Sequence, residues 1–368
     1  MGGSRPEILI VGAGPTGLAA ALELARRGYR PRIIDRDAGP TPLSKAVGIA
    51  AHTLDLLEPS GVAERLIEAG IRIERGYVWY KNRRIGTIDF TGLPHRHNFL
   101  LSLPQSETER IMSAVLAEQG VSVEWQTALT GISPNGRGID VILGGSSGDA
   151  RPAEEVHFDY VFGADGIHSA VRSGARIPFP GHTHRRDWSI ADVELNDWFY
   201  EPKAAHLFLC GNGDIGFTVP VAPLTYRIVA NTPNPLPLMD GGFEVKRVLR
   251  TDVFKITVKQ AETYQAGGAF LGGDAAHVHS PVGARGMNLG IEDAVAFAAH
   301  LDAGKLDLYT AERKAVGQRW IALSERILGI AQLSTPGLVA LRNFAFRIVG
   351  HVPPLQRPLL KRVAGLVE

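Results

Sequence analysis

One acid and two histidines lie within six positions of the chain, at Asp274, His277 and His279, directly after an apolar run. Such a group could bind a metal ion, act as an acid/base pair, or use its carboxylate to hold the hydroxyl groups of a bound molecule. Two histidines are too few for a closed metal site, and inside a turn their side chains diverge. We therefore expect no metal here, with one histidine packed in the loop and the other hydrogen-bonded to backbone.

A glycine pattern near the start of the chain is the second candidate ligand site. The apolar run at residues 8–11 is followed at once by a GxGxxG segment. In this setting the glycines allow a tight turn, close approach of backbone to a pyrophosphate, and close packing of helix on strand. The phosphates would then lie at a helix N-terminus, whose N–H groups and dipole favour an anion. The segment consists of Gly12, Ala13, Gly14, Pro15, Thr16 and Gly17.

The elements that must position this loop follow from the apolar spacing. Residues 8–11 read as a buried parallel strand, apolar residues between 18 and 25 recur at helical spacing, and Gly28 ends that helix before a strand at 31–34. Asp35 ends this second strand, where a carboxylate can accept hydrogen bonds from ribose hydroxyls. The same glycine pattern at 211–216 lies between two strand-like runs with no helix after it, so it predicts a hairpin turn.

Two later segments have the same strand-then-glycine form, namely FDYVFGADGIHSAVR at 158–172 and AFLGGDAAHVHSP at 269–281. Together with the first glycine loop, and in this order, they resemble the para-hydroxybenzoate-hydroxylase-like (class A) family of FAD-dependent aromatic monooxygenases. The resemblance runs from Glu7 to about Arg313. It implies non-covalently bound FAD as cofactor, and NADPH or NADH as a transient reductant.

The resemblance also implies roles for individual residues. Asp35 and Arg36 would bind the adenosine ribose, Asp165 would serve both FAD and the nicotinamide nucleotide, and Asp274 would hold the ribitol. Lys45 stands where the family usually has an arginine near the pyrophosphate, and Ala284 where glycine is common. The remaining residues implied at the cofactor are Gln105, Leu129, Pro281, Gly286, Met287 and Asn288.

Residues 286–288 precede an apolar pattern at helical spacing, which predicts a helix N-terminus there. Such a terminus would stabilise negative charge on the reduced flavin. The tail from Leu306 onward is predicted to be helical, with breaks at Pro336 and at Pro353 and Pro354. Two apolar stretches of this tail with scattered arginine and lysine indicate either a helix packed across the two domains or at a dimer contact, or an interfacial helix.

The expected fold class is α/β. A Rossmann-like FAD-binding domain is interleaved with a smaller, mainly antiparallel β-sheet substrate domain, and helices follow at the C-terminus. The FAD-binding domain is expected at 1–72, 96–176 and 265–320, the substrate domain at 73–95 and 177–264, and the C-terminal helical segment at 321–368. The substrate sheet would cover the flavin ring.

Composition limits the class of partner. With 39 basic and 38 acidic residues the formal charge is +1, which gives no overall field to attract nucleic acid or a membrane. A single cysteine excludes an internal disulfide and suits the reducing cytoplasm. No apolar run is long enough for a signal peptide or a membrane span. We expect a cytoplasmic monomer or homodimer that acts on a small molecule.

The resemblance implies hydroxylation or epoxidation of a small aromatic or polyketide-like compound by dioxygen through a flavin C4a-hydroperoxide, as in secondary metabolism. The flavin supplies the chemistry, so no catalytic residue is assigned. If the substrate is a phenol, a base would help, and His182, His206 and Tyr226 are candidates in the substrate region. The alternatives are a flavin-binding protein without turnover, a flavin-dependent halogenase, and a prenyl reductase.

Overall fold

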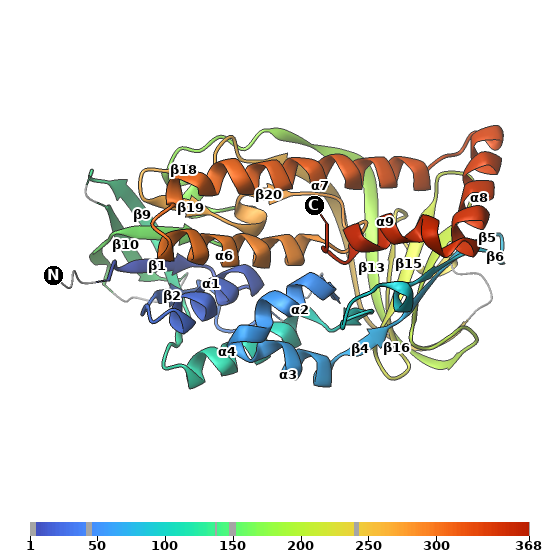
Figure 1. Cartoon of the computed structure of the whole chain (residues 1–368), viewed down its shortest axis with the longest axis horizontal. Helices are drawn as coiled ribbons and strands as arrows, with labels where there is room; N and C mark the ends of the chain where they lie inside the picture. The colour runs from blue at the N-terminus through green and yellow to red at the C-terminus, as the bar shows by residue number, and fades with distance from the viewer. Residues whose placement is uncertain (1–4, 42–45, 137, 147–151, 239–242, 368) are drawn as a thin grey trace.

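The computed structural model describes residues 5–41, 46–136, 138–146, 152–238 and 243–367. Two sheets lie at opposite ends of an elongated molecule, and the long helix α7 runs between them (Figure 1). The sheet that contains the first strand of the chain is at the left of this view, and the large twisted sheet is at the right. This arrangement confirms the α/β fold class with a separate sheet domain and C-terminal helices.

The first sheet forms around the glycine loop. Its central strand β1 is buried along its whole length and pairs in parallel with β2 and β12. Burial on both faces explains why this strand is continuously apolar. The strand order is β18 (Gln265–Ala266), β19 (Ala269–Leu271), β12 (Tyr160–Gly163), β1 (Ile8–Val11), β2 (Arg32–Ile34) and β8 (Val123–Glu124).

Helices and two small sheets surround this sheet. The helix α1 ends at Arg26, and Gly28 with φ of 82° follows it, as predicted. The helices are α1 (Pro15–Arg26), α2 (Ala51–Leu57), α3 (Val62–Ala69), α4 (Gln105–Glu118), α5 (Ala170–Gly174) and α6 (Gly286–Asp302). The small sheets are β3 (Gly48–Ile49), β7 (Leu100–Ser102) and β4 (Ile71–Ile73), and β11 (Glu154–Phe158), β10 (Ile139–Gly145) and β9 (Thr127–Pro134).

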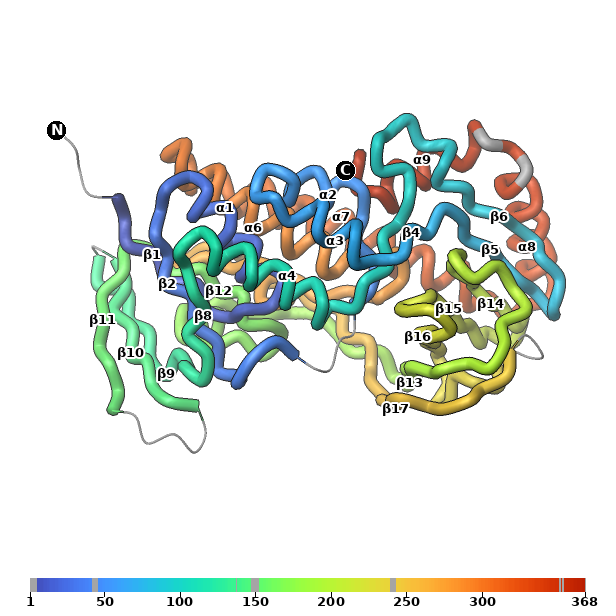
Figure 2. Tube along the Cα trace, turned by 90° about the horizontal axis from the view of Figure 1, so that it is seen from below, coloured from blue at the N-terminus to red at the C-terminus, as the bar shows by residue number. Residues whose placement is uncertain are grey.

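The large sheet is mainly antiparallel and lies at the other end of the molecule (Figure 2). Most of its strands come from the two ranges in which we expect the substrate domain. The GxGxxG match at 211–216 joins β14 and β15 as an antiparallel hairpin, which confirms that it is not a second nucleotide loop. The order is β20 (His277–Val278), β17 (Phe243–Gln260), β13 (Gly181–Trp198), β16 (Thr225–Ala230), β15 (Ile215–Ala222), β14 (Ala204–Leu209), β5 (Arg75–Tyr80) and β6 (Arg83–Asp89).

The C-terminal helices are α7 (Tyr309–Ala331), α8 (Pro336–His351) and α9 (Pro353–Val363). The predicted breaks are confirmed, and the prolines begin α8 and α9 because a first-turn residue needs no N–H. The helix α7 continues through residue 320, where we expected a domain boundary. It runs from the first sheet to the large one (Figure 1). Within the described residues, no helix combines the length and apolar character needed to cross a bilayer.

The glycine loop is held against the second half of the first sheet by close backbone contact. A Cβ on Gly273 would lie 2.5 Å from Thr16 Oγ1, and one on Gly290 would lie 2.2 Å from the same atom. Because these separations are far below van der Waals contact, only glycine lets α1, α6 and the segment after β19 meet here. The packing therefore brings the loop at 12–17 next to Asp274.

We predict that Gly290→Ala destabilises the protein by about 1–3 kcal/mol, because the new methyl group overlaps Thr16. The matched control is Gly329→Ala, also inside a helix, where an added Cβ meets nothing within 4 Å. This control should be neutral or stabilising by up to about 1 kcal/mol. Urea unfolding of both variants checks the prediction, and equal stabilities would contradict it.

Candidate functional site

The N-terminus of α1 is open to an anion. Gly14 is the N-cap residue, no side chain caps the helix, and its first turn contains no acidic residue. Pro15 is the first helical residue and has no N–H, while helix geometry leaves the next N–H groups without intrahelical partners. This helix end therefore has the positive potential and the free donors that a pyrophosphate requires.

The three glycines of the loop have different surroundings. Gly12 has φ of +101°, and a Cβ there would lie 2.4 Å from Ala164 O; a Cβ on Gly17 would lie 1.8 Å from Gly12 O. Gly14 is open, since its Cβ would meet only Glu109 Oε1 at 4.0 Å. The outer glycines are thus required by turn and packing, whereas the middle one leaves room for a ligand to reach the backbone.

The Asp35 carboxylate is tied to the same loop. Its Oδ2 accepts a hydrogen bond from Ala13 N at 2.6 Å, and its Oδ1 accepts one from Asp37 N at 2.9 Å. Arg36 is exposed beside it. The end of β2 therefore presents a partly buried carboxylate next to the glycine loop, where a ribose bound beyond the pyrophosphate can reach it.

Glu109 is a buried residue of this site that the sequence analysis missed. Its Oε1 accepts a hydrogen bond from Gln105 Nε2 at 2.8 Å, and its Oε2 accepts one from Thr41 N at 3.0 Å. Burial raises the pKa of this carboxyl, and Asp35 and Asp37 act in the same direction against those two hydrogen bonds. Its place one helical turn after Gln105 was the signal available in the sequence.

The Asp165 carboxylate caps the short helix α5. It accepts hydrogen bonds from Ser169 Oγ, from Ala170 N at 2.6 Å and from Val171 N at 3.1 Å. Burial raises the pKa of Asp165. These bonds fix the segment that packs against Gly12, so the carboxylate shapes the loop. The roles of Asp165 and of Leu129, which is buried in β9, toward the cofactor stay predictions.

The structure answers the question raised by the acid and two histidines. Asp274 is exposed in the short helix η4 (Gly273–Ala275) beyond the end of β19, whereas both histidines are turned into the protein. His279 Nδ1 bonds to Ser280 O at 2.8 Å, and burial lowers its pKa to about 4. His277 does more than pack, because its Nε2 lies 2.6 Å from Asp293 Oδ2. The three side chains do not converge on one point.

Asp293 is the centre of a buried group of charges beneath this segment. Its Oδ2 also accepts a hydrogen bond from Gly273 N at 3.0 Å, and its Oδ1 accepts one from Arg313 Nε at 2.8 Å. Burial alone would raise the pKa of Asp293, but His277 and Arg313 together hold it below its usual value. Arg285 pairs with Glu292, the residue before Asp293 in α6, and lies over the Trp320 ring at 4.7 Å.

Asn288 joins the loop at 281–288 to the N-terminal half of the site. Its Oδ1 accepts hydrogen bonds from Ala50 N at 2.8 Å and from Thr53 Oγ1 at 2.7 Å. Its Nδ2 donates to Gly48 O at 2.9 Å and to Ala284 O at 2.7 Å. All four hydrogen-bonding positions of the amide are therefore used for structure.

The helix α6 begins at Gly286, which confirms the predicted helix N-terminus at 286–288. Met287 lies in the first turn of this helix, and Pro281 lies in the loop before it. Ala284 has φ of 53°, in the left-handed region that favours glycine. This conformation explains why glycine is common there in the family. Lys45 lies outside the residues that the structure describes.

The three candidate bases differ in their surroundings. His206 is buried, accepts Trp79 Nε1–H at Nδ1 and bonds Glu201 O through Nε2, and burial lowers its pKa to about 4. Tyr226 stacks on Trp198, and burial raises its pKa to about 12. Both belong to an aromatic cluster on one face of the large sheet, so neither has the free, exposed ring or hydroxyl that a base needs. His182 is exposed at the start of β13.

The other face of the large sheet packs against α7 and α8 and, through Val282, against the loop at 281–288. We call it the inner face; it is apolar and includes Ile190, Ile215, Phe217 and Val229, and Val282 packs against this cluster. A cavity of about 710 Å³ lies elsewhere, between the tips of the β5–β6 and β14–β15 hairpins. No residue predicted at the cofactor lines that cavity, so we do not assign the substrate to it.

Comparison with known proteins places this arrangement in a family. The profile of the FAD binding domain family matches residues 5–232 and 240–324. The chain is 30% identical to an uncharacterised aromatic compound monooxygenase of Bacillus subtilis, with 98% of the chain and 75% of that protein aligned. It is 32% identical to pentachlorophenol 4-monooxygenase of Sphingobium chlorophenolicum, over 88% of the chain and 65% of that protein.

Solved structures agree. Anhydrotetracycline hydroxylase of Streptomyces rimosus superposes with a TM-score of 0.82 at 28% identity, covering 99% of this chain and 76% of that one. The p-nitrophenol 4-monooxygenase of Pseudomonas putida superposes with a TM-score of 0.88 over 97% of both chains. At 21% identity the second match supports the fold alone.

We predict that Glu109→Ala weakens FAD binding about tenfold, because the loss of two hydrogen bonds worth about 0.5–1.5 kcal/mol each releases Gln105 and the backbone at Thr41. Glu107→Ala is the control, since that residue lies in the same helix and pairs with Arg110 on the surface. Titration of the apoprotein with FAD, followed by flavin fluorescence, measures both. Unchanged affinity in Glu109→Ala would contradict the assigned role.

We predict that Asp293→Asn costs about 1–3 kcal/mol at neutral pH, because it removes the carboxylate that buried Arg313 and His277 share, while Glu292 stays 3.4 Å from Arg313. The folded-state pKa of Asp293 is lowered, so its contribution is present above the unfolded-state pKa. The difference from wild type should therefore shrink below about pH 4, as the carboxyl becomes protonated. Urea unfolding from pH 7 to pH 3 tests this, with Asp302→Asn, half-exposed at the end of α6, as control.

Proposed function

The chain belongs to the para-hydroxybenzoate-hydroxylase-like family of FAD-dependent aromatic monooxygenases, and on this premise we propose that it hydroxylates a small aromatic or polyketide-like compound. Curated relatives include pentachlorophenol 4-monooxygenase and, from Streptomyces rimosus, 6-methylpretetramide 4-monooxygenase at 32% identity. The chain spans 65% and 67% of the lengths of these two proteins. NAD(P)H and dioxygen are the proposed co-substrates, and the cytoplasm, which supplies NAD(P)H, is the proposed location.

The residues present fit the successive parts of an FAD molecule. The uncapped N-terminus of α1 suits the pyrophosphate, Asp35 suits the adenosine ribose, and exposed Asp274 suits the ribitol. When bound, FAD would accept a hydride from the nicotinamide and activate dioxygen. The N-terminus of α6 faces the same region and would stabilise negative charge on the ring system with its backbone N–H groups.

One observation supports an aromatic substrate. The inner face, against which Val282 of the flavin loop packs, is apolar, as a surface that receives an aromatic ring must be. A wall that excludes water also protects reactive intermediates from side reactions such as hydrolysis. A substrate between this face and the flavin loop would be covered by strands β13, β15 and β16.

The same face carries one buried ion pair. Arg227 lies two residues before Val229 and Asp192 lies two after Ile190, so both share the inner face. Arg227 Nε and Nη2 donate to the two carboxylate oxygens of Asp192 at 2.7 Å each. The pair therefore places a buried, neutralised charge on an otherwise apolar face.

The function is tested with the FAD-loaded protein. We predict that anaerobic NADPH or NADH bleaches the oxidised flavin absorbance. In air, a phenol or polycyclic phenol accepted as substrate should raise NAD(P)H oxidation about tenfold or more and give a product heavier by one oxygen atom. The proposed substrate class would be contradicted if NAD(P)H reduced the flavin but no phenol or polycyclic phenol gave a hydroxylated product. Retained FAD that neither nucleotide reduces would instead indicate a flavin-binding protein without turnover.

A further inference from the structure

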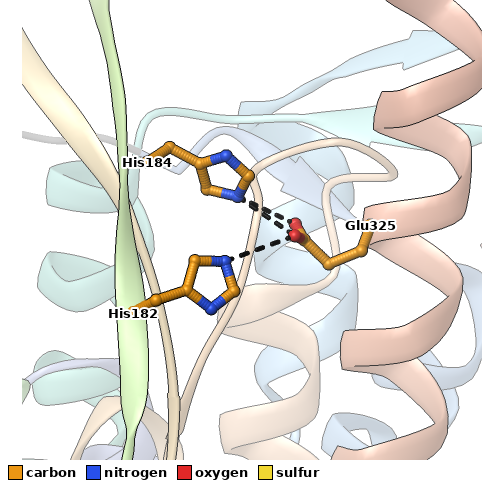
Figure 3. Close-up of side chains that lie close together, drawn as sticks. All are labelled: His182, His184 and Glu325. Atoms are coloured by element: carbon orange, nitrogen blue, oxygen red, sulfur yellow. Dashed lines mark hydrogen bonds and ion pairs between the residues drawn. The ribbon is translucent and has the colours of Figure 1, made fainter.

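Three potential metal ligands meet where the large sheet contacts α7. His182 and His184 point from β13 toward Glu325 on α7 (Figure 3). We propose that this group binds a divalent cation that prefers nitrogen ligands, Zn²⁺ above all. The three side chains would leave one coordination position of the ion for water. Imidazole and carboxylate are ligands that suit zinc, and three protein ligands leave such a site open.

The local structure explains why the two imidazoles are neighbours, with their ring planes inclined at 59°. Side chains two residues apart on a strand project from the same face; His182 pairs with Val258 of β17, and His184 follows where the register shifts between Thr183 and Asp187. The ring centroids of His182 and His184 are 5.1 Å apart. A helix that crosses this face can then supply the third ligand.

The ligand atoms are close to the spacing that a zinc ion needs. His184 Nε2 lies 3.0 Å from Glu325 Oε2, and His182 Nε2 lies 3.7 Å from the same oxygen. The three ligand atoms all lie within 4.8 Å of one another. Tetrahedral zinc with bonds of about 2.0–2.1 Å places its ligands about 3.4 Å apart, so small side-chain rotations complete the site.

The carboxylate of Glu325 has no competing cation. Across the described ranges of the chain, no lysine or arginine pairs with it, and its ion-pair partners are these two histidines. Glu325 and His184 are each 28% exposed and His182 is 59% exposed, so an ion can enter from solvent. The nearby Arg186 is directed away, toward Asp214.

A second His-x-His pair in the chain provides a contrast. His95 Nε2 lies 2.9 Å from Asp55 Oδ2 and His97 Nε2 lies 3.7 Å from Asp55 Oδ1, much as in the proposed site. Here, however, the guanidinium of Arg96 bonds to Asp55 Oδ1 at 2.8 Å. A fixed cation on the carboxylate opposes binding of a second one, so we expect no metal at this pair.

A bound ion would link two parts of the molecule. The ligands join β13 of the large sheet to α7, and Leu328, one turn after Glu325, packs on the inner face. The other end of α7 contributes Arg313 to the buried charges around Asp293. An ion at this site would therefore restrain the helix that connects the substrate sheet to the flavin half, independently of the flavin chemistry itself.

The test uses the FAD-loaded full chain without a histidine tag. Titration calorimetry with ZnCl₂ should give one ion per chain, and MgCl₂, which prefers oxygen ligands, should give no binding. His184→Gln and Glu325→Gln should each weaken zinc binding tenfold or more, while His95→Gln should leave it unchanged. Zinc should also raise the unfolding midpoint of the wild type, and not that of His184→Gln.

Electron paramagnetic resonance of one equivalent of CuCl₂ gives a second readout that does not depend on a variant's stability. The wild-type spectrum should show two coordinating nitrogens, and His182→Gln should show one. The proposal is overturned if zinc does not bind, if His184→Gln and Glu325→Gln bind it like the wild type, if His95→Gln abolishes binding, or if the copper spectrum shows fewer than two nitrogens.

Discussion

The compensation of one buried charge organises the flavin half of the molecule. Asp293 is fully buried, and an isolated carboxylate in such surroundings would be strongly unfavourable. Its two oxygens are therefore bonded to Gly273 N and His277, from the segment after β19, and to Arg313 of α7. By satisfying this charge, the chain fixes the turn that presents Asp274 and the start of the strand that joins the large sheet. The position of Asp274, the carboxylate proposed to hold the ribitol, is thus set by the buried groups beneath it.

Asn288 has a comparable role on the opposite wall of the site. Its amide joins the segment at 48–53 to the loop at 281–288, and these segments lie more than 200 positions apart in the chain. The flavin ring would lie between a backbone wall fixed by this amide and the apolar inner face of the large sheet. Preorganisation of this kind costs no rearrangement when the ligand binds, which favours both affinity and exclusion of water.

Local patterns in the sequence predicted the parts of the site that depend on backbone. The glycine loop, the start of α6 and the hairpin at 211–216 each follow from residues within a short window. The missed residues depend on contacts between distant segments. The spacing from Gln105 was visible for Glu109, but its contact with Thr41 depends on the packing of α4 beside the glycine loop. The partner of His277 is 16 residues away on another element. The His-x-His spacing was visible in the chain, but Glu325 is 141 positions from His184, so no spacing rule could join them.

The strand order of the first sheet has a consequence for how the protein is made. The central strand β1 at residues 8–11 pairs with β12 at 160–163, and β12 pairs in turn with β19 at 269–271. At about 5–20 residues per second, a ribosome needs roughly 8–30 s to make the partner of β1 after β1 itself is made. During that interval an apolar strand with one unpaired edge is exposed, and such edges attract other chains. Recovery of folded protein during expression should therefore depend on chaperone supply and on the rate of translation as well as on the stability of the finished fold.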